Sequence, residues 1–186
     1  MIEGRITNLR ALDAGDGATV ARWNNDPAVR AHLGRRYPRP ALFQEAAHQP
    51  YVASPQGYGA VHWIIETKDS IAIGDIGLYG GAPEDRHASI GMMIGETAYW
   101  SQGYGSDALR SVLRFAFSEM NLHRVELEAH ADNARGIAAY RKCGFVEEGV
   151  LRDASHRAGA WKDHVVMAVL SEEFLARDAV AHREES

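Results

Sequence analysis

The sequence predicts an α/β domain whose sheet is mixed but mostly antiparallel and is flanked by helices. In the first half, three β-rich segments follow one another with short turns between them, which is typical of an antiparallel meander. In the second half, helical and extended segments alternate, which indicates a crossover connection. Together the two patterns favour a mixed sheet over a doubly wound parallel one.

The N-terminal residues predict an edge strand followed by two short helices. Residues 6–12 alternate weakly between apolar and polar side chains. Asp13 or Asp16 can cap a helix that runs to about Asn24. Pro27 then suits the first turn of a second helix, because its fixed φ is helical and its missing N–H needs no partner there.

The middle of the chain predicts one more helix and then the meander. An alanine-rich stretch at 41–47 is expected to be helical, and the prolines and glycine at 50–57 indicate a loop. After this loop the pattern changes to that of strands, and valine and isoleucine become frequent. The three strands are expected at residues 59–66, 71–79 and 88–95.

The second half predicts helices and strands in alternation. Apolar side chains at helical spacing in residues 109–120 predict a helix with one buried stripe. Arg124–His130 alternates strictly and is expected to be a half-buried strand. Asn133 can cap a further helix that ends at Gly144. Two strands at 145–151 and 162–170 and a frayed polar tail at 178–186 complete the chain.

Length and composition bound the class of protein. The 186 residues fit one domain, which we place at residues 1–178 with a flexible tail at 179–186. A hydrophobic content of 46% is too high for intrinsic disorder, and a net charge of −5 disfavours nucleic-acid binding. The single cysteine excludes an internal disulfide and a multi-cysteine zinc site, so no metal is expected. Apolar runs are too short to span a bilayer and no signal peptide is evident, so we expect a cytoplasmic protein without membrane contacts.

A glycine-rich segment at 100–109 lies where the meander meets the long helix. Gly103 and Gly105 permit a tight turn and expose backbone N–H groups at the positive end of the helix dipole. The segment could therefore cradle a phosphate or pyrophosphate, or simply form a turn. Gly103 to Ala108 also fits the G-x-G-x-x-A pattern of nicotinamide dinucleotide sites, with Glu126 near the position of the ribose-binding acid. Such a loop, however, normally follows the first strand of a parallel sheet.

Together with the block Asn133–Phe145, this loop resembles the GNAT superfamily of acetyl-CoA-dependent N-acetyltransferases, in particular its RimJ/RimL-type branch. The resemblance covers nearly the whole chain. It implies a GNAT-like sheet that is splayed between two central strands. It also implies acetyl transfer from acetyl-CoA to a primary amine, which could belong to a protein N-terminus, a polyamine or another small amine. The further matching segments are 6–12, 23–27, 90–96, 122–126 and 163–167.

The resemblance also assigns coenzyme contacts. The strand before the loop should pair with the amides of pantetheine through the backbone of Met93 and Ile94. Asn133 should cap its helix and could touch the coenzyme. Arg135 and Lys142 could meet the 3′-phosphate, or they could be solvated side chains only. The residues expected at the pyrophosphate are Ser101, Gln102, Gly103, Tyr104, Gly105 and Ser106.

Tyr140 is the expected general acid, because a tyrosine at this place in the family lies beside the coenzyme sulfur and can protonate the thiolate. The general base stays open. Many members of the branch carry a glutamate two residues before the glycine corresponding to Gly91, and this chain has Ser89 there. A base acting through water, or solvent alone, is a further alternative. The substitutes considered are Glu126, Glu128, His130 and Asp75.

The acceptor is expected to bind between the N-terminal helices and the region 38–57. The aromatic candidates for this wall are Trp23, Tyr37, Tyr51, Trp63 and Tyr79. Two other interpretations stay open, namely a non-catalytic acyl-CoA-binding or regulatory module on the same fold, and a nicotinamide-binding protein. The first interpretation stays open because this chain has Ser89 at the position where many members of the branch carry a glutamate. Dimers are common in the branch, so a homodimer is also considered.

Overall fold

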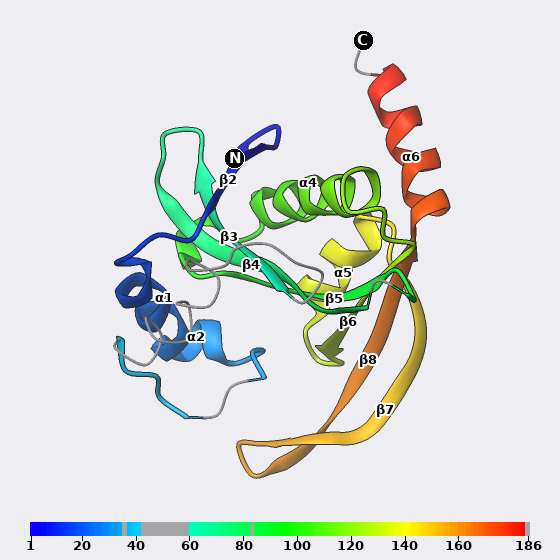
Figure 1. Cartoon of the computed structure of the whole chain (residues 1–186). Helices are drawn as coiled ribbons and strands as arrows, with labels where there is room; N and C mark the ends of the chain where they lie inside the picture. Colours follow the sequence, from blue (N-terminus) through cyan, green and yellow to red (C-terminus); the bar gives the residue numbers. More distant parts are fainter. Residues whose placement is uncertain (35–36, 42–59, 83, 185–186) are drawn as a thin grey trace.

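The structure is a computed structural model that describes residues 1–34, 37–41, 60–82 and 84–184. Its framework is one eight-stranded sheet with the order β1-β2-β3-β4-β5-β6-β8-β7 (Figure 1). Most of the helix expected at 41–47, the loop at 50–57 and Tyr51 lie outside the described residues. The strands are β1 (Ile2–Glu3), β2 (Thr7–Ala11), β3 (Ala60–Thr67), β4 (Ala72–Ala82), β5 (His87–Ile94), β6 (Arg124–His130), β7 (Val146–Arg157) and β8 (Ala160–Leu170).

The predicted mixed sheet is confirmed. Strands β2 to β5 pair antiparallel in sequence order, which is the expected meander. β5 and β6 run parallel, and β6, β8 and β7 are again antiparallel. The helices are α1 (Asp16–Asn25), α2 (Pro27–Arg30), the 3₁₀ turn η1 (Thr97–Tyr99), α4 (Tyr104–Ser118), α5 (Ala134–Lys142) and α6 (Ser171–Glu184).

The expected splay lies between β5 and β6. The two strands pair only over His87–Ser89 of β5. Beyond this short ladder β5 continues to Ile94 and β6 to His130 without pairing to each other. β5 stays bonded to β4 and β6 to β8 along these stretches, so each strand is held straight while a gap opens between them.

Helices cover both faces of the sheet. α4 and α5 lie on one face, and α1 and α2 lie on the other (Figure 1). The apolar stripe of α4, which the spacing predicts, is buried in the larger core together with Val125 and Leu127 of β6. The smaller core on the opposite face consists of Leu12, Val20, Trp23, Val29, Ile64 and Met93.

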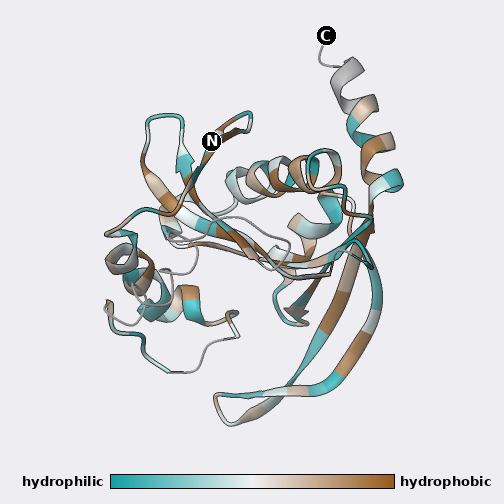
Figure 2. Cartoon of the chain, in the orientation of Figure 1, coloured by the Kyte–Doolittle hydropathy of each residue, from teal (hydrophilic) through white to brown (hydrophobic). Residues whose placement is uncertain are grey.

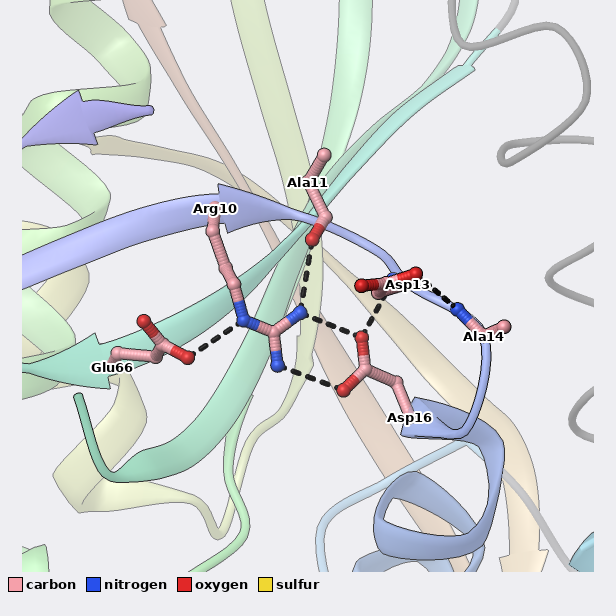
Figure 3. Close-up of polar contacts among 6 residues, drawn as sticks. All are labelled: Arg10, Ala11, Asp13, Ala14, Asp16 and Glu66. Atoms are coloured by element: carbon pink, nitrogen blue, oxygen red, sulfur yellow. Dashed lines mark hydrogen bonds and ion pairs between the residues drawn. The ribbon is translucent and has the colours of Figure 1, made fainter.

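An arginine ties α1 to the sheet (Figure 3). The guanidinium of Arg10 on β2 donates to both carboxylate oxygens of Asp16, at 2.7 and 2.8 Å, and its Nε donates to Glu66 on β3 at 2.6 Å. The helix cap predicted from Asp13 or Asp16 is wrong, because Gly15 (φ 97°) is the N-cap residue and no side chain caps α1. The Asp16 carboxylate is used instead by Arg10 and by the Asp13 N–H.

The second half follows the predicted order of elements with two differences in length. Asn133 caps α5 as expected, because its Oδ1 accepts from the Gly136 N–H at 3.0 Å. β7 and β8 are longer than predicted and form a hairpin that projects from the body of the molecule (Figure 1). α6 continues to Glu184, into the segment assigned to a polar tail, because Phe174 anchors its first turn in the core. None of the described helices is long and apolar enough to cross a membrane.

Candidate active site

The gap between β5 and β6 opens into a cavity of about 560 Å³. Its walls come from both faces of the sheet. Tyr104 of α4 and Tyr140 of α5 line it from one side, and Val29 and Leu33 from the region of α2 line it from the other. The cavity therefore passes between the strands and connects the two faces.

The backbone of β5 presents alternate residues to this gap. The Gly95 N–H donates to the carbonyl of Ile73 at 2.8 Å, so the backbone of Gly95 points to β4. Because successive residues of a strand point their backbone groups to opposite edges, Met93 also faces β4 and Ile94 faces the gap. The family resemblance predicts that both residues offer backbone groups to pantetheine. Of the two, only Ile94 points toward the gap.

Trp100 links the glycine loop to the end of β5. Its indole Nε1 donates to the Ile94 carbonyl at 2.8 Å. The guanidinium of Arg135 on α5 lies 3.6 Å from the centre of a Trp100 ring, in cation–π contact. Burial lowers the pKa of Arg135 from its usual value. The Ile94 N–H is thus left for a ligand in the gap, while the carbonyl fixes the loop.

The glycine loop ends at the first turn of α4. Gly103 is the N-cap residue at φ 91°, and no side chain caps the helix, so the first N–H groups of α4 have no side-chain acceptor. This arrangement forms an anion site at the positive end of the helix dipole. A Cβ atom on Gly105 would lie 3.3 Å from Met92, so glycine lets the loop approach β5 closely. The loop residues that line the cavity are Ser101, Gly103, Tyr104, Gly105 and Ser106. Gln102 does not line it, and its side chain donates to the Ala98 carbonyl instead.

Asp107, which the sequence analysis did not single out, fixes the position of this loop. Its carboxylate accepts hydrogen bonds from the Arg5, Ile6 and Thr7 N–H groups and from the Thr7 hydroxyl, at 2.7–3.1 Å. Burial alone would raise the pKa of Asp107, but these hydrogen bonds outweigh it and lower the pKa. The first turn of α4 is thereby bound to the N-terminal segment about 100 residues away.

Tyr140 and Cys143 lie close together on the inner side of α5. Tyr140 lines the cavity, and burial, followed by the neighbouring Cys143, raises the pKa of its phenol, so the proton is retained at neutral pH. The Cys143 thiol is buried behind the loop, where it donates to the Ser106 carbonyl at 3.4 Å. Burial raises the pKa of Cys143 to about 11, which disfavours the thiolate that a nucleophilic cysteine needs.

The remaining predicted coenzyme residues line the cavity from α5. Asn133, Arg135 and Lys142 all contribute to its wall. Arg135 and Lys142 therefore bring two positive charges to the side of the cavity that also contains the glycine loop.

Three of the candidate bases lie outside the cavity lining. Ser89 and Glu126 stand side by side at the last paired position of β5 and β6. Glu126 accepts from Arg124 Nε at 3.0 Å. The His130 ring is buried, and its centre lies 4.7 Å from the centre of the tilted His164 ring. Burial, followed by the repulsion of His164, lowers the pKa of His130.

The two other acidic candidates do line the cavity. Asp75 on β4 is buried, with 7% of its side chain exposed, and its Oδ2 lies 2.8 Å from Nε2 of the equally buried His62. Glu128 on β6 is 57% exposed and lies 3.3 Å from Nδ1 of His164. The negative side chains of the cavity thus stand apart from the positive ones on α5.

One of the aromatic wall candidates lines the cavity. The ring of Tyr79 lies over Gly91, where a Cβ atom would come within 3.1 Å of it. Trp23 is instead buried in the smaller core, and Trp63 packs against Phe115 in the larger one. Tyr37 is 81% exposed. Within the described part of the chain, no group of three or more His, Cys, Asp or Glu side chains is placed to hold a metal ion.

Comparison with known proteins identifies the family. Residues 7–146 match the model of the acetyltransferase (GNAT) domain. The uncharacterized N-acetyltransferase YoaA of Bacillus subtilis is 31% identical over 123 residues, which are 66% of this chain and 69% of the relative. The spermidine N(1)-acetyltransferase of Vibrio cholerae is 24% identical over 169 residues, which are 91% of this chain and 95% of the relative.

Solved structures show the same fold. A crystal structure of spermidine N-acetyltransferase from Vibrio cholerae in complex with CoA and spermine superposes with a TM-score of 0.83 at 22% identity, covering 91% of this chain and 98% of that one. The GNAT match replaces the nicotinamide dinucleotide interpretation of the glycine loop. Because the family model matches residues 7–146, which are most of the sequence, this chain belongs to the GNAT family of acetyl-CoA-dependent acetyltransferases.

Proposed function

We propose that this protein transfers the acetyl group of acetyl-CoA to a primary amine of a small cationic acceptor by direct attack in a ternary complex. The observation that carries this proposal is the cavity that connects the two faces of the sheet. Its positive side, with the glycine loop, Arg135 and Lys142, suits the phosphates of the coenzyme. Its negative side, with Asp75 and Glu128, suits an ammonium group.

The chemistry needs a positioned thioester, a neutral amine, a donor for the developing oxyanion and a proton for the departing thiolate. The Ile94 N–H faces the gap and supplies the oxyanion donor in this proposal. Tyr140 supplies the proton, because its burial keeps the phenol protonated. The amine nitrogen forms the new bond to the carbonyl carbon as the carbon–sulfur bond breaks. No acetyl-enzyme is needed, and the one cysteine, Cys143, is buried in its thiol form.

The acceptor class and cellular context are part of the same proposal. A polyamine such as spermidine fits the negative side of the cavity and agrees with the activity named for the Vibrio cholerae relative. The motifs at 90–96 and 133–145 support membership of the RimJ/RimL-type branch. We also propose a cytoplasmic location, which the reaction's need for acetyl-CoA supports.

We also propose that the protein forms a homodimer through the β7–β8 hairpin. β7 is the last strand of the sheet, so one of its edges has no neighbouring strand in the order of the sheet. Val150 and Leu151 on β7 and Trp161 on β8 are 44–62% exposed. Figure 2 shows hydrophobic stretches along the hairpin that projects from the body. An exposed apolar edge strand favours pairing with a second chain.

Release of free thiol from acetyl-CoA, measured with spermidine, butylamine and a short peptide with a free N-terminus, tests the function. We expect amine-dependent thiol release that is fastest with spermidine, and an acetylated amine in the mass spectrum. Coenzyme A binding without thiol release on any of these amines would instead support the alternative of a non-catalytic acyl-CoA-binding module.

A further inference from the structure

We propose that Asp75, held in place by His62, is the group that takes the proton from the acceptor ammonium. The inference rests on the proposed function and assigns the base of that reaction. It replaces the role that Ser89, in the place of a family glutamate, cannot fill, because a serine hydroxyl is too weak a base to deprotonate an ammonium unaided.

The register of the sheet shows which face Asp75 occupies. Asp75 lies directly between Ile64 of β3 and Met93 of β5. Cross-strand neighbours project to the same face, and both Ile64 and Met93 pack in the smaller core with α1 and α2. Asp75 therefore points to this face. Tyr140 packs against the larger core on the α4 face.

The cavity thus has a carboxylate on one face of the sheet and a phenol on the other, with the gap between β5 and β6 separating them. This is the arrangement that amide formation from a thioester requires. The proton acceptor must stand beside the incoming nitrogen, and the proton donor must stand beside the departing sulfur on the opposite side of the carbonyl carbon. Asp75 and Tyr140 satisfy this condition through their positions alone.

Burial distinguishes Asp75 from the other acids of this region. A carboxylate with 7% exposure is costly to bury unless it is paired. Among the described residues, the ring of His62 is its side-chain partner, and Oδ1 makes no hydrogen bond to them. Glu128 is more than half exposed, and Glu126 is bonded to Arg124 outside the cavity. Among the acidic candidates that line the cavity, Asp75 is therefore the one whose carboxylate is both buried and held by a partner.

The acceptor ammonium gives one proton to the Asp75–His62 pair, which gains one positive charge, and leaves a neutral amine with a free electron pair. The nitrogen attacks the carbonyl carbon, and the carbon–sulfur bond electrons leave with the thiolate. Tyr140 gives its phenol proton to the thiolate, and the nitrogen loses its second proton to solvent, which reprotonates Tyr140. The proton held by the pair returns to solvent.

The direct test is the pH dependence of kcat/KM in Asp75→Asn, with spermidine and butylamine as probes. The titratable and charged groups described around Asp75 are His62 from β3, Tyr79 from β4, His32 from the turn after α2 and Glu128 from β6. We expect a loss of about 100-fold at pH 7. We also expect kcat/KM of the variant to rise about tenfold per pH unit above pH 7, because it depends on amine that solvent has already deprotonated. The wild type should show a flatter profile.

Three further variants separate a proton-accepting role from a structural one. Asp75→Glu keeps a carboxylate and should recover part of the rate. His62→Gln should cost about tenfold in wild type but little more in the Asp75→Asn background, because His62 acts as a positioning residue through Asp75. Glu126→Gln is the control, because it removes a carboxylate that lies on the same face of the sheet but does not line the cavity. This variant should retain wild-type kcat/KM. Coenzyme A affinity, measured by calorimetry, should stay unchanged in all of them.

An Asp75→Asn profile parallel to that of the wild type would overturn the assignment, and so would an unchanged kcat/KM at pH 7. Either result would leave the proposed function standing, provided that the wild type acetylates spermidine or butylamine. A wild type that acetylates neither these amines nor the peptide would instead contradict the proposed function itself.

Discussion

Tyr140 lies at the α5 wall of the cavity with a phenol whose pKa is raised by burial. A group that donates its proton to a thiolate must enter the reaction protonated, and the raised pKa ensures this through the neutral range. We predict that Tyr140→Phe lowers kcat by about 100-fold and leaves the Kd of coenzyme A unchanged, because the ring and its packing are kept. Steady-state kinetics together with calorimetric titration measures both quantities. An unchanged kcat would remove Tyr140 from the role.

Lys142 and Arg135 supply positive charge to the α5 wall of the cavity. If they contact the 3′-phosphate, Lys142→Gln should raise the KM for acetyl-CoA about tenfold and leave kcat unchanged, because a contact made equally before and during the reaction affects binding only. The comparison uses dephospho-coenzyme A, which lacks that phosphate. Wild type should bind it more weakly than coenzyme A, and Lys142→Gln should bind both with nearly equal Kd. Equal weakening of both ligands would point to a contact with the pyrophosphate instead.

The residues that sequence reasoning identified are those whose signal is local. Asn133 caps the helix that begins one residue later, and the glycines of the loop act within the same turn. The residues that it missed or left undecided depend on contacts with other segments of the chain. Asp107 binds Thr7 across 100 residues, and Asp75 depends on His62 of the neighbouring strand. Asp75 was one of several open candidates for the base, and only the register of the sheet sets it apart.

At the scale of elements, Asp107 binds α4 to the N-terminal segment, and this contact depends on pH. Because the folded-state pKa of Asp107 is lowered, its contribution to stability is present above the unfolded pKa of about 4 and is lost as the pH falls through the folded value. We predict that Asp107→Ala lowers the free energy of unfolding by about 1–3 kcal/mol at pH 7. In urea denaturation the difference from wild type should shrink toward pH 2. A difference independent of pH would contradict this explanation.

The bounds of a strand or helix were predicted correctly where the hydrophobic pattern of its sequence matches the way it packs in the fold. β6 alternates strictly and appears at the predicted residues. β7 continues to Arg157 although its second half is polar, because pairing with β8 and not burial holds it in place. α6 was missed because its sequence is polar, and its stabilising contact, Phe174 against Phe117 at 5.5 Å between ring centres, comes from α4. Tertiary contacts of this kind leave no periodic signal.

At the scale of the whole molecule, the β7–β8 hairpin carries the prediction of a dimer. We expect wild type to sediment as a dimer at micromolar concentration and Val150→Lys to sediment as a monomer, because a charge at this apolar edge opposes association. Leu175→Lys is the matched control. Leu175 on α6 is 42% exposed, similar to Val150, but it lies outside the hairpin. Dissociation by both variants, or a monomeric wild type, would contradict this interface.

The splayed sheet forms one cavity that reaches from the glycine loop and α5 on one face to Val29 and Leu33 on the other. The central claim is that both substrates occupy this cavity together and that the acetyl group moves in one step. The most direct measurement is the initial rate with acetyl-CoA and spermidine both varied. We predict that the double-reciprocal plots of initial rate against substrate concentration intersect, as a ternary complex requires. Parallel lines would indicate an acetyl-enzyme intermediate and would contradict it.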